Sequence, residues 1–201
     1  MHIDLDHCDI EPADECPECL EAVLQDGFTL QGVPEQRRTP KLCKIAVQSC
    51  PSVFPWVPMV LMTDELCSVA IQHDGALLFH VPEDRMSQDL CELAVRGTGY
   101  ALSLVPDGYR TAEICEIAVR SAGISLEHVP TRHLSKEICE IAVRQDGMAL
   151  EFVPLEHRSA SMCEIACKNN CLAEPHVPLR CPCCNANLLP NSLTPIWKRK
   201  T

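Results

Sequence analysis

The sequence predicts an all-α protein, an α-solenoid of seven 24-residue helical-hairpin repeats with atypical capping ends. Cysteine recurs at every 24th residue from Cys19 to Cys163, and Val-Pro recurs at the same interval as far as Pro178. An alanine stands three residues after each periodic cysteine. A period that is held seven times without an insertion is the signature of a repeat protein. We therefore expect each unit to bury its apolar faces against its neighbours.

The composition excludes several classes of protein. Aliphatic residues must form the core, because 46% of the 201 residues are hydrophobic but only 4% are aromatic. The net charge of −11 disfavours binding to nucleic acid and to anionic membranes. No apolar run approaches the roughly 18 residues of a transmembrane helix, and the acidic N-terminus does not resemble a signal peptide. The odd count of 15 cysteines then predicts a reducing compartment, the cytoplasm.

The limits of the repeat divide the chain into three parts. We expect an N-terminal cap segment over residues 1–14, the seven-repeat solenoid over 15–180, and a cysteine-rich knuckle with a basic tail over 181–201. Terminal repeats of a solenoid are expected to be atypical, because one face of each meets water. The second and seventh repeats indeed replace the recurring glycine, with Pro51 and Cys171.

Each repeat opens with an amphipathic helix, as residues 135–147 illustrate. Ser135 stands at the N-cap position, where a hydroxyl can accept a hydrogen bond from an amide of the first turn. The apolar residues within 138–143 are spaced by one helical turn and form a wide buried face. Gly147 is expected to end the helix in the left-handed conformation.

The second half of each repeat is shorter and fits two local structures. Leu150 and Val153 are one helical turn apart, which predicts a short second helix before the proline. Residues 148, 150 and 152 also alternate, so an extended segment is the alternative.

The periodic cysteines are predicted to be small buried packing residues. Each stands in the middle of an apolar helical face, and cysteine packs as a small hydrophobic residue. Equivalent Cα atoms of stacked helices are about 8–10 Å apart, which exceeds the reach of a disulfide. Burial should also raise the pKa of these thiols and make them slow to react.

Ordered pairs of charges mark the exposed side of the helices. An acid precedes a base by four residues, which is the favourable order, in Glu92–Arg96, Glu116–Arg120, Glu140–Arg144 and Glu164–Lys168. Stacking should align these charges into rows. The rows are interpreted either as a docking surface for a protein or peptide partner or as a solvated helix face.

Four aromatic residues lie outside the repeat pattern. They are candidate partner contacts, and they are Trp56, Phe79, Tyr100 and Tyr109. No non-repeating serine or cysteine with histidine and aspartate forms a catalytic set, so we do not expect an enzyme.

The C-terminal cysteines form the one constellation with ligand-like chemistry. Cys167 and Cys171 are spaced i,i+4 on one helix, and Cys181 and Cys184 form a C-x-x-C knuckle. Four thiolates suit one tetrahedral structural Zn²⁺, while thiols without a metal are the alternative. Cys16 and Cys19 form a second C-x-x-C, but Cys19 belongs to the buried periodic series, which argues against a ligand role.

The unit LCxxAVxxxGxALxxVPxxxRT resembles a bacterial and viral repeat family, the domain of unknown function DUF4116. The match is close from Cys67 to Pro154 and looser from Cys19 to Pro178. The resemblance implies a helical array of short repeats, and it carries no catalytic residues. Such repeats occur in proteins that bacteria and viruses of single-celled hosts use against cells, so an effector is one implied role.

Two functions follow from these observations. The leading hypothesis is a non-catalytic scaffold that binds a protein or peptide, because stacking explains nearly all of the recurring residues. The alternative is a zinc- or redox-responsive protein that acts through its terminal cysteine cluster.

Overall fold

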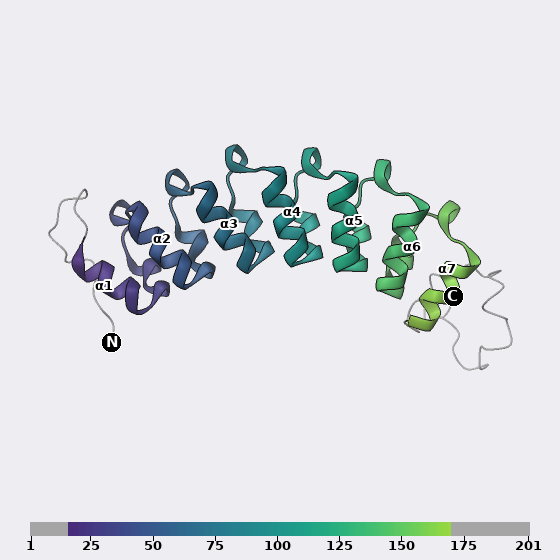
Figure 1. The fold of residues 1–201 in the computed structure, drawn as a ribbon, viewed down its shortest axis with the longest axis horizontal. Coiled ribbons are helices and arrows are strands. Elements are labelled where there is room, and N and C mark those ends of the chain that lie inside the picture. The colour runs from purple at the N-terminus through teal and green to yellow at the C-terminus, as the bar shows by residue number, and fades with distance from the viewer. Residues whose placement is uncertain (1–15, 170–201) are drawn as a thin grey trace, which may run out of the picture.

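The computed structural model describes residues 16–169, and in this range all regular elements are helices, without a β-strand. Seven α-helices follow one another along an arched rod (Figure 1). Consecutive α-helices pack side by side, and each of α1–α6 also packs against the six-residue helix that follows it. The predicted all-α repeat solenoid is confirmed. None of the described helices is long and apolar enough to cross a membrane.

Each of the first six repeats contains one α-helix and two 3₁₀ segments, and of the seventh the structure describes the α-helix. The α-helices are α1 (Pro17–Gln25), α2 (Pro40–Ser49), α3 (Asp64–His73), α4 (Gln88–Gly97), α5 (Ala112–Ser121), α6 (Lys136–Gln145) and α7 (Ala160–Asn169). The six-residue 3₁₀-helices are η2 (Gly27–Gly32), η4 (Pro51–Trp56), η6 (Gly75–His80), η8 (Gly99–Leu104), η10 (Gly123–His128) and η12 (Gly147–Phe152). The three-residue turns after each Val-Pro are η3 (Glu35–Arg37), η5 (Met59–Leu61), η7 (Glu83–Arg85), η9 (Asp107–Tyr109), η11 (Thr131–His133) and η13 (Leu155–His157).

The second half of each of the first six repeats is helical, which decides for these repeats between the two alternatives that the sequence left open. It is a 3₁₀-helix, and in three repeats an aspartate caps it. The carboxylates of Asp26, Asp74 and Asp146 each accept a hydrogen bond at 2.9 Å from the amide two residues on. The three-residue turn after Val-Pro is a further element that the spacing did not predict.

The predicted hydroxyl caps are present on helices α2–α7. Thr39, Thr63, Ser87, Thr111, Ser135 and Ser159 accept hydrogen bonds at 3.2–3.3 Å from the amide three residues on. These bonds satisfy an amide that has no partner within the helix. Helix α1 differs, because its N-cap is Cys16.

The apolar face predicted for each α-helix forms the core. In α5, Ile114, Cys115, Ala118 and Val119 are all fully buried. Buried leucines of the six-residue helices, such as Leu102 and Leu126, form the other side of this core. The small Cys and Ala side chains of one helix therefore lie at the centre of the contact with the next repeat.

The expectation that glycine ends each helix in a left-handed conformation is wrong. No described glycine has a positive φ, and Gly99 instead opens the six-residue helix η8. A Cβ atom at Gly99 would overlap the carbonyl oxygen of Ala118 and lie 2.8 Å from the Ala122 amide nitrogen. The recurring glycine is therefore required because successive repeats approach each other closely.

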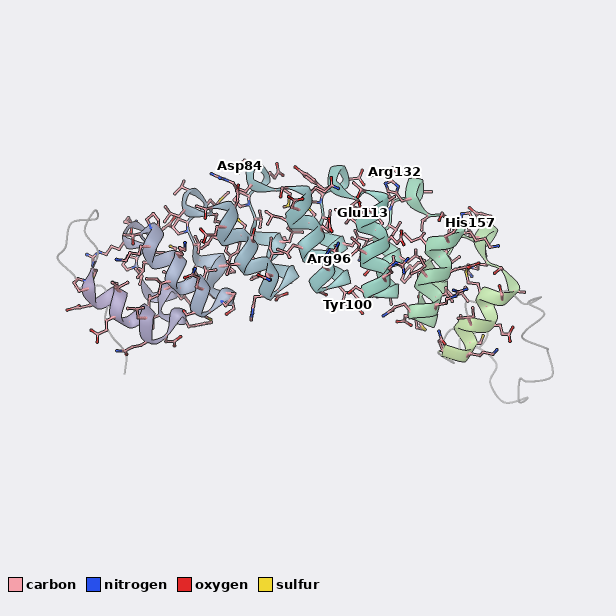
Figure 2. The ribbon with its side chains drawn as sticks, viewed as in Figure 1. Asp84, Arg96, Tyr100, Glu113, Arg132 and His157 are labelled. Atoms are coloured by element: carbon pink, nitrogen blue, oxygen red, sulfur yellow. The ribbon has the colours of Figure 1, made fainter. Side chains whose placement is uncertain are left out.

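The α-helices run between the two edges of the arch (Figure 1). The three-residue turns line the outer edge, where Figure 2 shows Asp84, Arg132 and His157. Tyr100, just after the C-terminal end of α4, lies at the inner edge (Figure 2). Every repeat thus contributes the same helix positions to the same edge.

Candidate functional site

The charged pairs predicted from the sequence form as expected. Nε of Arg96 donates to Glu92 at 2.9 Å, and Nε of Arg120 donates to Glu116 at 3.0 Å. The guanidinium of Arg144 is 3.7 Å from the carboxylate of Glu140. In all three pairs the base is mostly exposed, so each contributes only about 0.3–0.5 kcal/mol to the helix. Stability alone does not account for the repetition of these pairs.

A second row of acids lies at the start of the same helices. Asp89, Glu113 and Glu137 are exposed in the first turns of α4, α5 and α6. Hydrogen bonds from its own backbone amide and from the Ser135 hydroxyl lower the pKa of the Glu137 carboxyl. Figure 2 shows Glu113 nearer the outer edge of the arch and Arg96 nearer the inner edge.

We define the charged face as the charged side chains of these two acidic rows and one basic row on α4–α6. It consists of Asp89, Glu92, Arg96, Glu113, Glu116, Arg120, Glu137, Glu140 and Arg144. Six carboxylates against three guanidiniums leave this face with three excess negative charges. Next to the glutamates stand the half-buried aliphatic residues Leu93, Ile117 and Ile141, which pack on the core. The face therefore offers both charge and partly exposed apolar area.

The four aromatic candidates do not form one cluster. Phe79 and Tyr100 are 73% and 60% exposed, as expected of contact residues. Trp56 is half-buried and meets the Phe28 ring edge-on, with centroids 5.6 Å apart. The Tyr109 hydroxyl donates to the Met86 carbonyl at 3.0 Å, which joins two neighbouring repeats. Phe79 and Tyr100 are thus the two that present large exposed ring surface.

The periodic cysteines are buried, as predicted. Every one from Cys19 to Cys163 is at most 1% exposed. Burial raises the pKa of the Cys43, Cys91, Cys115 and Cys139 thiols from an ordinary 9.0 to about 11. A neutral thiol is a poor nucleophile and a poor metal ligand, so these four cysteines act as packing residues.

The structure describes only one residue of the predicted zinc set. Cys167 lies on α7 and is half-buried, whereas Cys171, Cys181 and Cys184 lie outside the described residues. Within residues 16–169 no three cysteine, histidine or acidic side chains are grouped closely enough to hold a metal. The four-cysteine zinc site stays a prediction.

An arginine just before the N-cap has a role that sequence reasoning missed. Arg110 donates to the carbonyls of Val105 at 2.7 Å, Ser103 at 3.3 Å and His128, in the next repeat, at 3.4 Å. Arg38 forms the same three-way pattern. The available signal was the recurrence of arginine before the hydroxyl cap at 38, 110 and 158. This arginine fixes the turn after Val-Pro and holds neighbouring repeats together.

Comparison with known proteins finds a family match for part of the chain. Residues 112–158 match the family model of a domain of unknown function, DUF4116. The match runs from the start of α5 to just past η13, which is two repeats. The family resemblance is therefore confirmed over this stretch. No curated protein and no solved structure matches the chain.

The raised thiol pKa values predict how stability depends on pH. The folded state favours the protonated thiols, so their contribution is fully present below about pH 9 and is lost as the pH rises toward 11. We expect the urea midpoint, followed by circular dichroism, to fall over this range. In Cys91→Ala/Cys115→Ala the fall should be shallower. A midpoint that declines equally in both proteins would show that these thiols do not titrate differently on folding.

The zinc hypothesis predicts about one Zn²⁺ per chain after purification without added metal. Elemental analysis measures this directly, and a chelator should lower the melting temperature because metal binding stabilises the folded state. Cys181→Ser/Cys184→Ser should lose the metal, whereas Cys50→Ser, outside the predicted set, should retain it. Metal-free protein whose melting is insensitive to chelator would exclude the site.

Proposed function

We propose that the protein is a non-catalytic repeat scaffold that binds another protein through the charged face. The support is the regular alignment of charged side chains on successive α-helices of one arch. An elongated repeat array provides a long surface without a deep pocket, which suits a protein or peptide better than a small molecule. The proposed contacts on this face are Glu92, Arg96, Glu116, Arg120, Glu140 and Arg144.

The charge balance of the face favours a basic partner. Six acids and three arginines give local excess negative charge, and the whole chain carries −11. Opposite charge on the partner would speed association and select it over acidic proteins. The half-exposed Leu93, Ile117 and Ile141 would receive apolar side chains of the same segment. A basic segment with interspersed apolar residues is therefore the proposed ligand.

The cellular setting is proposed on the chemistry of the cysteines and on the family match. Buried thiols that stay protonated, as the raised pKa of Cys91 illustrates, suit a reducing compartment. We therefore place the protein in the cytoplasm. The resemblance of the repeats to those of bacterial and viral proteins extends the proposal to an effector delivered into a host cell.

A second candidate function belongs to the C-terminal cysteines. Cys167 is half-buried at the helix position where the six preceding repeats bury valine or isoleucine, such as Val119 and Val143. A metal ligand at this position of the last repeat requires a thiol in place of the aliphatic side chain. A zinc- or redox-responsive role for this cluster is the alternative to the scaffold, and the metal assay above tests it.

Removing charge from the charged face should weaken partner binding. The test variant is Glu92→Gln/Glu116→Gln/Glu140→Gln. The matched control, Glu83→Gln/Glu127→Gln/Glu156→Gln, removes the same three charges from exposed positions on the 3₁₀ segments. The partner is first isolated with the unaltered full-length protein from native cells, and its affinity is then measured by calorimetry at two salt concentrations.

We expect about a tenfold or greater loss of affinity in the test variant, larger at the lower salt concentration because salt screens the charges that were removed. The control should bind within about twofold of the unaltered protein, because exposed charges outside an interface contribute little. Equal weakening of both variants would place the interface elsewhere. Failure to recover any stoichiometric partner would contradict the scaffold function itself.

A further inference from the structure

The first α-helix begins with a pair of cysteines in an arrangement that the other described repeats lack. Cys16 is the N-cap of α1, Pro17 is the first helical residue, and Cys19 lies one turn further on. The sulfur of Cys16 accepts a hydrogen bond from the Cys19 amide at 3.4 Å. The Cys16 side chain is therefore directed toward the turn that contains Cys19.

The register of the cap places these two cysteines one helical turn apart. In the later repeats a serine or threonine caps the helix four residues before the periodic cysteine, as Thr39 does for Cys43. In the first repeat the cap is only three residues before it and is itself a cysteine. Residues spaced i,i+3 have Cβ atoms about 5–6 Å apart, so a small adjustment of an N-terminal turn permits a disulfide.

Positive groups lie next to the pair, and positive charge near a thiol favours the thiolate that disulfide exchange requires. Both cysteines line a small cavity together with the cationic residues Arg37 and Lys41. The amide hydrogen bond to Cys16 and the positive end of the helix dipole also favour negative charge on the Cys16 sulfur. Cys91 belongs to the same apolar core, but burial alone acts on its thiol and raises its pKa.

Both cysteines are buried, Cys19 more completely than Cys16. Cys16 is 8% exposed and Cys19 is 1% exposed. In a C-x-x-C pair at a helix N-terminus, an accessible first thiol attacks the substrate disulfide and a buried second thiol resolves the product. The order of exposure in this helix matches those two roles.

We propose that Cys16 and Cys19 are a reversible dithiol–disulfide pair that exchanges with low-molecular-weight disulfides. Cys16 loses its proton to solvent, and its thiolate attacks one sulfur of the small disulfide, which forms a mixed disulfide and releases one small thiolate that takes up a proton. Cys19, after losing its proton to solvent, attacks the Cys16 sulfur and releases the second small thiolate, which takes up a proton. Two protein thiols and one small disulfide give one protein disulfide and two small thiols, so two electrons leave the protein. This activity is independent of the charged face.

The test uses the full-length chain in mixtures of reduced and oxidised glutathione, followed by acid quenching, alkylation and mass spectrometry. Trypsin releases a fragment of residues 1–37 that contains Cys8, Cys16 and Cys19. A Cys8→Ser background leaves the pair as the two cysteines of this fragment. We expect a Cys16–Cys19 disulfide that forms with excess oxidised glutathione and disappears with excess reduced glutathione. Cys91 should remain reduced throughout.

Two single variants in the same background separate the steps. Cys16→Ser should keep α1 capped, because Ser87 caps α4 in the same way. This variant should not react with oxidised glutathione, because the attacking thiol is missing. Cys19→Ser should accumulate glutathione on Cys16, because the resolving thiol is missing.

Three results would overturn the proposal. The first is a fragment that stays reduced in excess oxidised glutathione. The second is glutathione that remains bound to Cys16 although Cys19 is present. Protection of the pair that ends only when a zinc chelator is added would instead identify a metal site.

Discussion

The fold depends on a close approach between successive repeats. The first residue of η8 meets the last turns of α5, where the Ala118 carbonyl occupies the space that a side chain at Gly99 would need. The same contact recurs between Gly75 and Ala94 and between Gly123 and Ala142. Small residues on both sides let the 3₁₀ layer of one repeat lie directly against the next α-helix. This contact keeps neighbouring α-helices close enough to bury their cysteines and alanines.

The same regular stacking arranges the exterior. Because each repeat presents the same helix positions, the acids at the start and middle of α4–α6 and the arginines near their ends align into rows. No single pair in these rows adds much stability. Their effect is collective, since a long partner would meet several equivalent charges at once. The first repeat departs from the common cap and there acquires a second thiol, Cys16, next to a periodic cysteine.

Much of this architecture could be predicted from the sequence. Local spacing predicts the hydroxyl caps, the buried face of α5 and charged pairs such as Glu116–Arg120. These features depend on residues that are close together along a single helix. The stacking of apolar faces could be predicted, but the individual atoms that meet between repeats could not. The sequence shows that Gly99 lacks a side chain but not which atom fills the space, and it shows Arg110 but not the carbonyls that a turn directs toward it. Tyr109 likewise looks like a surface aromatic until its bond to Met86 is seen.

The close approach is tested most directly by two alanine substitutions at neighbouring glycines. Gly99→Ala places a methyl group against the Ala118 carbonyl, whereas Gly97, at the end of α4, has open space around the same position. We expect Gly99→Ala to lower the free energy of unfolding by about 1–3 kcal/mol or more. Gly97→Ala should raise it by up to about 1 kcal/mol, because alanine favours the helix. Urea unfolding of the two variants measures both changes, and equal stabilities would contradict the packing of repeats described above.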